Sequence, residues 1–152
     1  MRLYSQGLFI LAAGMGLTAM ARQTPLASPL VPGDYRLVSV GGKSLPALLD
    51  TDDGCRELVT AATLSLGADG KWTLRHDERH ECPSGVRNKT ESEHGKYTMS
   101  GSTVTFMDDD GDRNTGGTPD DDIDLDELDQ GTLLGTTLNV RLKEGQALVF
   151  QR

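Results

Sequence analysis

Apolar and polar residues alternate along most of the chain beyond residue 33, with the period of two that is typical of β-strands. The clearest example is a hairpin at the end of the chain, where Leu138, Val140 and Leu142 alternate with polar residues before a turn at 143–146. Glycine-containing turns separate the other runs. The expected strands are 34–40, 59–66, 71–82, 95–100, 103–107 and the two sides of the hairpin within 135–152.

This pattern predicts an all-β fold, an antiparallel up-and-down meander of about seven or eight strands. A sheet of this kind exposes two hydrogen-bonding edges unless it curls shut, so we expect a small closed or half-open barrel. Residues 43–58, interrupted by Pro46 and Gly54, are expected to be an irregular crossing segment. At least four of the five aromatic residues beyond position 33 should be core residues: Tyr35, Trp72, Tyr97, Phe106 and Phe150.

The segment PGDYRLVSVGGKSLP (32–46) resembles the opening strand of lipocalin-like proteins, which include small exported bacterial barrels. In that family a glycine and an aromatic residue begin the barrel, and Gly33 and Tyr35 would take those places, with tyrosine where true lipocalins have tryptophan. The family packs a late arginine over the aromatic ring, a role open to Arg141 or Arg152. The segment also resembles META-type domains. The lipocalin resemblance implies a lipocalin-like barrel that binds a small apolar molecule inside, and it carries over no catalytic residue.

The first 32 residues differ from the rest. Arg2 precedes an uncharged run, 3–21, which ends in the small residues that a signal peptidase reads, so residues 1–21 are expected to be a signal peptide. An uncleaved membrane anchor is the alternative. Residues 22–32 contain three prolines and predict a flexible or extended tether, and 33–152 form the barrel domain. The protein is therefore expected to be exported, either periplasmic or extracellular, with no membrane attachment after cleavage.

The chain has two cysteines, Cys55 and Cys82. In an exported protein an even pair predicts a disulfide. Two free thiols or a metal-binding pair are the alternatives.

An acidic loop insertion, 108–130, holds eleven carboxylates and one arginine between Asp108 and Asp129. Fourteen basic and 23 acidic residues follow residue 21, so the loop accounts for the whole negative charge and the body is close to neutral. This balance argues against nucleic acid as a partner.

The loop could bind calcium. Asp108, Asp110, Asp112 and Asn114 alternate around Gly111, as oxygen ligands of calcium often do, although Arg113 and Pro119 exclude a true EF-hand. A solvated acidic loop and the binding of a basic partner are the alternatives.

No catalytic signature is present, so we do not expect an enzyme. His76 and His80 would share one face of a strand, but about 13 Å apart, too far for both to bind one metal ion. His94 is isolated. The sequence thus predicts a non-enzymatic protein that binds a small apolar ligand in the barrel, or alternatively an interaction or structural module whose acidic loop binds calcium or a basic partner. It leaves the oligomeric state open.

Calcium binding by the acidic loop predicts a higher melting temperature in millimolar calcium than in chelator, because a ligand that binds only the folded state stabilises it. Thermal melts of the protein without residues 1–21 measure this difference. A melting temperature that calcium leaves unmoved would rule out Asp108, Asp110, Asp112 and Asn114 as a calcium site.

Overall fold

A computed structural model of the chain describes residues 32–108, 123–125 and 127–152. In these ranges the chain forms ten β-strands, and it contains no helix long and apolar enough to cross a membrane. The strands are β1 (Gly33–Val40), β2 (Lys43–Ser44), β3 (Ala47–Asp52), β4 (Cys55–Leu66), β5 (Lys71–Cys82), β6 (Gly85–Ser100), β7 (Thr103–Asp108), β8 (Leu128–Leu134), β9 (Thr137–Leu142) and β10 (Ala147–Gln151).

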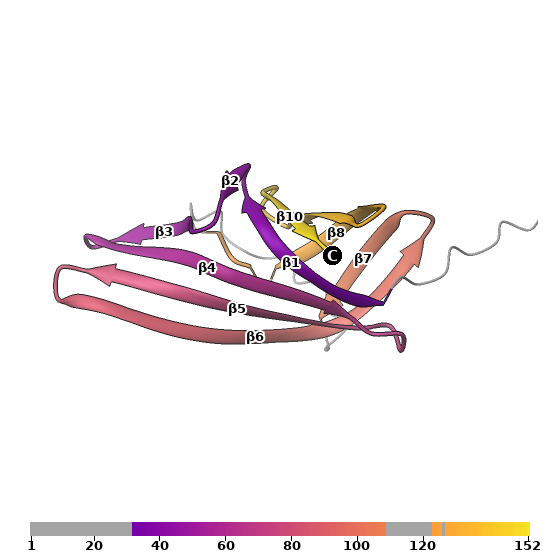
Figure 1. Cartoon of the computed structure of the whole chain (residues 1–152), viewed down its shortest axis with the longest axis horizontal. Helices are drawn as coiled ribbons and strands as arrows, with labels where there is room; N and C mark the ends of the chain where they lie inside the picture. Colours follow the sequence, from indigo (N-terminus) through magenta and orange to yellow (C-terminus); the bar gives the residue numbers. More distant parts are fainter. Residues whose placement is uncertain (1–31, 109–122, 126) are drawn as a thin grey trace, which may run out of the picture.

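The sheet closes on itself because β1 pairs with β10 on one side and with β4 on the other. From β4 to β10 each strand pairs antiparallel with the next one in the sequence. Eight strands, β1 and β4 to β10, therefore form a closed meander barrel, and β2 and β3 are extra edge strands (Figure 1). The predicted all-β, antiparallel up-and-down barrel is confirmed.

The barrel interior is filled by one cluster of apolar side chains. Trp72 and Phe106 meet edge to face, with ring centroids 6.0 Å apart, and Trp72 donates a hydrogen bond from Nε1 to the carbonyl oxygen of Met107. All five aromatic residues named from the sequence belong to this cluster, so the prediction of at least four core aromatics is confirmed. Burial of such large apolar surfaces is the main stabilising contribution to a fold of this size.

Residues 43–58 are more regular than the sequence predicted. They form β2, β3 and the first part of β4, with β3 and β4 joined as a hairpin. Asp53 and Gly54 make its two-residue turn, both with positive φ. An Asp-Gly pair favours the tight hairpin turn that this backbone needs, so the sequence did contain a signal for the hairpin.

The strand predicted at 95–100 is also longer than expected, because β6 begins at Gly85 and pairs with β5 along its whole length. Most of residues 85–94 are exposed and polar, and they show no alternation of apolar and polar residues. The regularity of this part of β6 comes from its hydrogen bonds to β5 rather than from burial of one face.

One part of the sheet extends beyond the barrel. β4 pairs with β1 only through Thr63–Leu66, and β6 pairs with β7 only from Gly95 onward. The remaining parts of these strands, 55–62 of β4 and 85–94 of β6, project with 76–82 of β5 and with β3 to one side of the molecule (Figure 1). We call this projection the arm.

A disulfide between Cys55 and Cys82 joins the first residue of β4 to the last residue of β5 in the arm. It confirms the predicted bridge and excludes the alternatives of two free thiols or a cysteine metal pair, since no cysteine remains free. A disulfide is consistent with an oxidising location outside the cytoplasm.

Arg152 lies beside the start of β1. A Cβ atom added to Gly33 would be 2.9 Å from Cζ of Arg152, so the guanidinium covers this glycine. Arg141 lies on β9, which β10 separates from β1. Of the two arginines that the lipocalin resemblance offered, Arg152 is therefore the one placed beside the opening strand.

The acidic loop of residues 108–130, called the acidic segment from here on, is described only near its two ends. Asp108 ends β7, and the predicted calcium ligands Asp110, Asp112 and Asn114 lie outside the described residues. Towards the second end, the backbone N–H of Ile123 donates to the carbonyl oxygen of Leu49 at 3.2 Å, and Leu125 and Leu128 are buried. This end of the segment is therefore attached to the barrel core and to β3.

Gly95 has no room for a side chain. It pairs with Trp72, and a Cβ atom there would overlap the carbonyl oxygen of Met107 and lie 2.7 Å from Nε1 of Trp72.

We predict that Gly95→Ala lowers the free energy of unfolding by about 1–3 kcal/mol, as expected for overpacking. Urea unfolding followed by the fluorescence of Trp72, the only tryptophan, measures it. Lys96→Ala, at an exposed neighbouring position, is the control and should change stability by less than about 0.5 kcal/mol. Equal stability of the two variants would contradict the close packing.

Candidate functional site

The inward face of β5 changes from apolar to polar halfway along the strand. Trp72 and Leu74 point into the barrel core, and the next residues on the same face are His76, Glu78 and His80. His76 and Glu78 are the two polar residues that are buried among those described. The polar half of this face lies in the arm, beyond the filled interior of the barrel.

The neighbouring strands add carboxylates to the same face. Glu57 of β4 pairs with His80, and Glu91 of β6 pairs with His76. A β-bulge between Val59 and Ala61 shifts the register of β4, and a one-residue shift of this kind exchanges the two faces of a strand. Without that bulge Glu57 would point to the opposite face. We call the five residues the His–Glu cluster: Glu57, His76, Glu78, His80 and Glu91.

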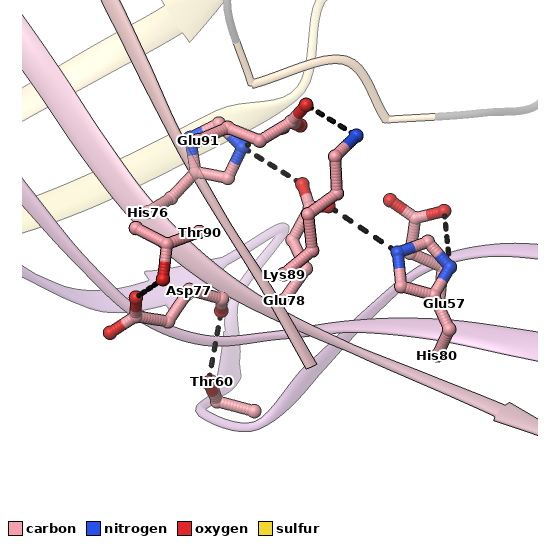
Figure 2. Close-up of polar contacts among 9 residues, drawn as sticks. All are labelled: Glu57, Thr60, His76, Asp77, Glu78, His80, Lys89, Thr90 and Glu91. Carbon is pink, nitrogen blue, oxygen red and sulfur yellow. Dashed lines mark hydrogen bonds and ion pairs between the residues drawn. The ribbon is translucent and has the colours of Figure 1, made fainter. Parts of the chain in front are cut away.

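Glu78 lies between the two imidazoles (Figure 2). Its Oε1 is 2.8 Å from Nε2 of His76, and its Oε2 is 3.6 Å from Nε2 of His80. The other two carboxylates of the cluster complete the arrangement: Oε2 of Glu91 is 3.4 Å from Nε2 of His76, and Oε2 of Glu57 is 3.4 Å from Nδ1 of His80. Each imidazole therefore has two carboxylates beside it, and both share Glu78.

The cluster is buried at its centre and is short of hydrogen bonds. The side chains of His76 and Glu78 are 4% and 5% exposed, whereas those of His80 and Glu57 are about one-third exposed. Nδ1 of His76 and Nε2 of His80 are buried atoms with no hydrogen-bond partner. A buried polar atom without a partner is destabilising by about 1–3 kcal/mol, so two of them in one cluster require an explanation.

A pocket of about 270 Å³ opens onto the cluster. Its lining residues in the described part of the chain include one histidine and six carboxylates, and no lysine or arginine. Ile123 and Leu125, from the attached end of the acidic segment, form one wall of the pocket. The acidic lining residues are Asp50, Glu57, Glu78, Glu91, Glu93 and Asp124.

Two carboxylates of the cluster have pKa values shifted in opposite directions. Burial, followed by the charge of the neighbouring Glu78, raises the pKa of Glu57 above its usual value of 4.5. A hydrogen bond from Lys89, which also forms an ion pair with Glu91, lowers the pKa of Glu91 below the same value. Each shift reflects the immediate surroundings, since Glu57 faces other acids and Glu91 faces an ammonium group.

The cluster offers two sets of potential metal ligands. Ligand atoms of Glu57, Glu78 and His80 lie within 4.8 Å of one another, and so do those of His76, Glu78 and Glu91. Imidazole nitrogen and carboxylate oxygen are the ligands that zinc and related ions accept together, whereas calcium and magnesium prefer oxygen alone. The arrangement suits a divalent transition-metal ion.

The sequence predicted part of this geometry. His76 and His80 do share one face of a continuous strand, and His94 is exposed on the opposite face of β6. Sequence reasoning set the histidines aside because one ion could not reach both, and it missed the three carboxylates. Continuing the alternation of β5 would have placed Glu78 between the histidines, but no local signal could have added Glu57 and Glu91.

Comparison of the chain with protein-family models, with curated proteins and with solved structures finds no match. The structure establishes the architecture, which is a closed eight-stranded antiparallel barrel. The case for function therefore depends on the contacts within the His–Glu cluster.

The opposite pKa shifts predict the order in which the cluster titrates. In metal-free protein, Glu57 should take up its proton above pH 4.5 and Glu91 below it, as measured by carbon NMR of the glutamate carboxyl groups during an acid titration. The stabilising contribution of Glu91 is present above pH 4.5 and is lost as the pH falls through its lowered pKa. The stabilising contribution of Glu57 has the opposite dependence: it is present below pH 4.5 and is lost as the pH rises through the raised pKa of Glu57.

The control for this titration is Lys89→Ala, which should raise the midpoint of Glu91 towards 4.5 while leaving that of Glu57 above it. Coincident midpoints for the two residues in the unaltered protein would contradict the geometry of the cluster.

Proposed function

We propose that this protein is a non-enzymatic, exported barrel that binds a divalent transition-metal ion of the zinc class at the His–Glu cluster. The observation that carries the proposal is the buried pair of His76 and Glu78, with carboxylates on both sides and Nε2 of both imidazoles facing Glu78. Ring nitrogens of this kind are the atoms through which histidine binds zinc.

The charges of the pocket support a cation. Buried carboxylates are strongly destabilising unless a positive charge or several hydrogen bonds compensate them. Here the only ion-pair partners described for Glu78 are two histidines, which are charged only when protonated. A divalent ion would offset the repulsion among the six carboxylates and would bind Nε2 of an imidazole that faces Glu78.

The filled interior of the barrel favours this polar site over an apolar ligand. Tyr35, Trp72 and Phe150 are almost completely buried in the same core cluster, so core side chains occupy the space in which a lipocalin-like barrel would hold its ligand. Binding of a small apolar molecule, membership of a lipocalin-like family, and binding of calcium or a basic partner at the acidic loop remain predictions from the sequence. Export is supported by the disulfide and by the expected signal peptide.

Zinc titration of the chelator-treated protein tests the proposal. A ligand that binds only the folded state stabilises it by about 2.7 kcal/mol when its free concentration is roughly 100 times Kd, so zinc should raise the melting temperature by several degrees. Isothermal titration calorimetry on the same sample should show saturable binding, and calcium at equal concentration should not replace zinc at this site.

Matched histidine variants locate the binding. We predict that His76→Gln weakens zinc binding at the set of His76, Glu78 and Glu91 at least tenfold, because glutamine keeps a polar side chain but loses the imidazole nitrogen, whereas His94→Gln on the exposed face leaves binding unchanged. If His76→Gln changed neither the amount nor the affinity of bound zinc, or if both variants lost binding equally, the proposal would be refuted.

A further inference from the structure

We infer that the His–Glu cluster binds two divalent ions and that Glu78 bridges them. This inference rests on the proposed function, because it assumes that the cluster binds metal. It concerns the number of ions and the way in which they share a ligand.

The two sets of potential ligands overlap in one residue. Glu57 and His80 form one set with Glu78, and His76 and Glu91 form the other. Glu78 presents a different oxygen to each imidazole, Oε1 to His76 and Oε2 to His80. This is the geometry of a bridging carboxylate, which gives one oxygen to each of two ions.

Neither set of ligand atoms that lie within 4.8 Å of one another contains both histidines, because His80 belongs to one set and His76 to the other. A zinc ion binds its nitrogen ligands at about 2.0–2.1 Å, so in this arrangement it reaches one imidazole only. Each imidazole therefore needs its own ion, and the carboxylate between them serves both. Nε2 is the nitrogen that faces Glu78 in both imidazoles, and Nε2 of His80 is a buried atom without a hydrogen-bond partner.

The two histidines line different pockets. The pocket of about 270 Å³ is lined by His76 and by carboxylates of both sets, Glu57, Glu78 and Glu91. His80 lines a second pocket of about 660 Å³ along the β5–β6 hairpin tip, together with the cationic Arg87 and Lys89.

The charge of the acidic pocket also favours two ions. Its six carboxylates carry six negative charges when all are ionised. Lys89 already compensates Glu91, so one divalent ion would leave three of these charges uncompensated, and two ions would leave one, in a place where burial weakens the screening by water.

The disulfide lies next to one half of the cluster only. Cys55 precedes Glu57 by two residues and Cys82 follows His80 by two, so both cysteines and both ligands share one face of the hairpin. The bridge therefore holds together the two strands that carry the outer ligands, Glu57 and His80. The inner ligands, His76 and Glu91, lie on the same strands as the core residues Leu74 and Tyr97 and are nearer to the barrel.

The experiment is a count of bound zinc by native mass spectrometry and by competition with a chromophoric chelator, on chelator-treated protein whose folding is checked by circular dichroism. We expect two ions per chain in the unaltered protein and in the control His94→Gln. Each of His76→Gln and His80→Gln should bind one. Glu78→Gln should weaken both ions at least tenfold, because it removes the shared charge.

The possible results separate the two proposals. One ion in the unaltered protein would overturn the bridge and leave the proposed function standing, whereas no ion would overturn both. Two ions that persist in His80→Gln would place the second ion elsewhere, for instance on the acidic segment, and would also overturn the inference.

Removal of the disulfide by Cys55→Ser with Cys82→Ser gives an additional test, because serine leaves no thiolate that could bind zinc beside Glu57 and His80. In this background, the zinc of His76→Gln, which occupies the outer set alone, should be bound more weakly, by several-fold. The zinc of His80→Gln, held by the inner set, should be affected less. Equal effects on the two variants would contradict the assignment of the ions to separate halves of the cluster.

Discussion

The short pairing between β1 and β4 is the constraint on which the rest of the structure depends. It joins Gly33–Arg36 to Thr63–Leu66 and closes a sheet that would otherwise leave two open edges. Because the pairing covers only the end of β4, the first part of that strand continues outside the barrel together with β5 and β6. The arm, and with it the His–Glu cluster, is a consequence of where the barrel closes.

The cluster is held between two stable parts of the molecule. On one side, β5 is anchored in the core by Trp72 and Leu74. On the other, the disulfide joins the ends of β4 and β5. This arrangement keeps the backbones of the two strands together, and the low dielectric at the buried centre of the site strengthens every interaction there. Such a site favours a cation because little rearrangement is needed when it binds.

The acidic segment places further negative charge beside the His–Glu cluster. The sequence 108–130 accounts for the whole net negative charge of the protein, and its described residues Asp124 and Leu125 lie against the pocket of the cluster. A concentration of negative charge beside a site raises the local concentration of cations and accelerates their encounter. Calcium binding by the segment and metal binding by the cluster are therefore separate hypotheses about neighbouring parts of one electrostatic surface.

The sequence alone determined the strand character, the meander, the aromatic core and the disulfide. These features follow from the alternation of apolar and polar residues within single strands and from the number of cysteines. Both can be read from the sequence without knowing how the strands pair. It also showed that His76 and His80 share a face. The sequence did not reveal the polar strand of residues 85–94, because β6 is held there by its backbone pairing with β5. The sequence did contain the Asp-Gly turn signal at 53–54, but the prediction of an irregular segment did not use it.

Only the tertiary structure decided which carboxylates meet the histidines. Glu57, Glu78 and Glu91 come from three strands, and their meeting depends on the register between those strands. That register is determined by two tight hairpin turns and by the bulge after Val59, which turns Glu57 to the inner face. A shift of one residue would point every one of these side chains to the other face, and the alternation within a single strand contains no information about its register with the next.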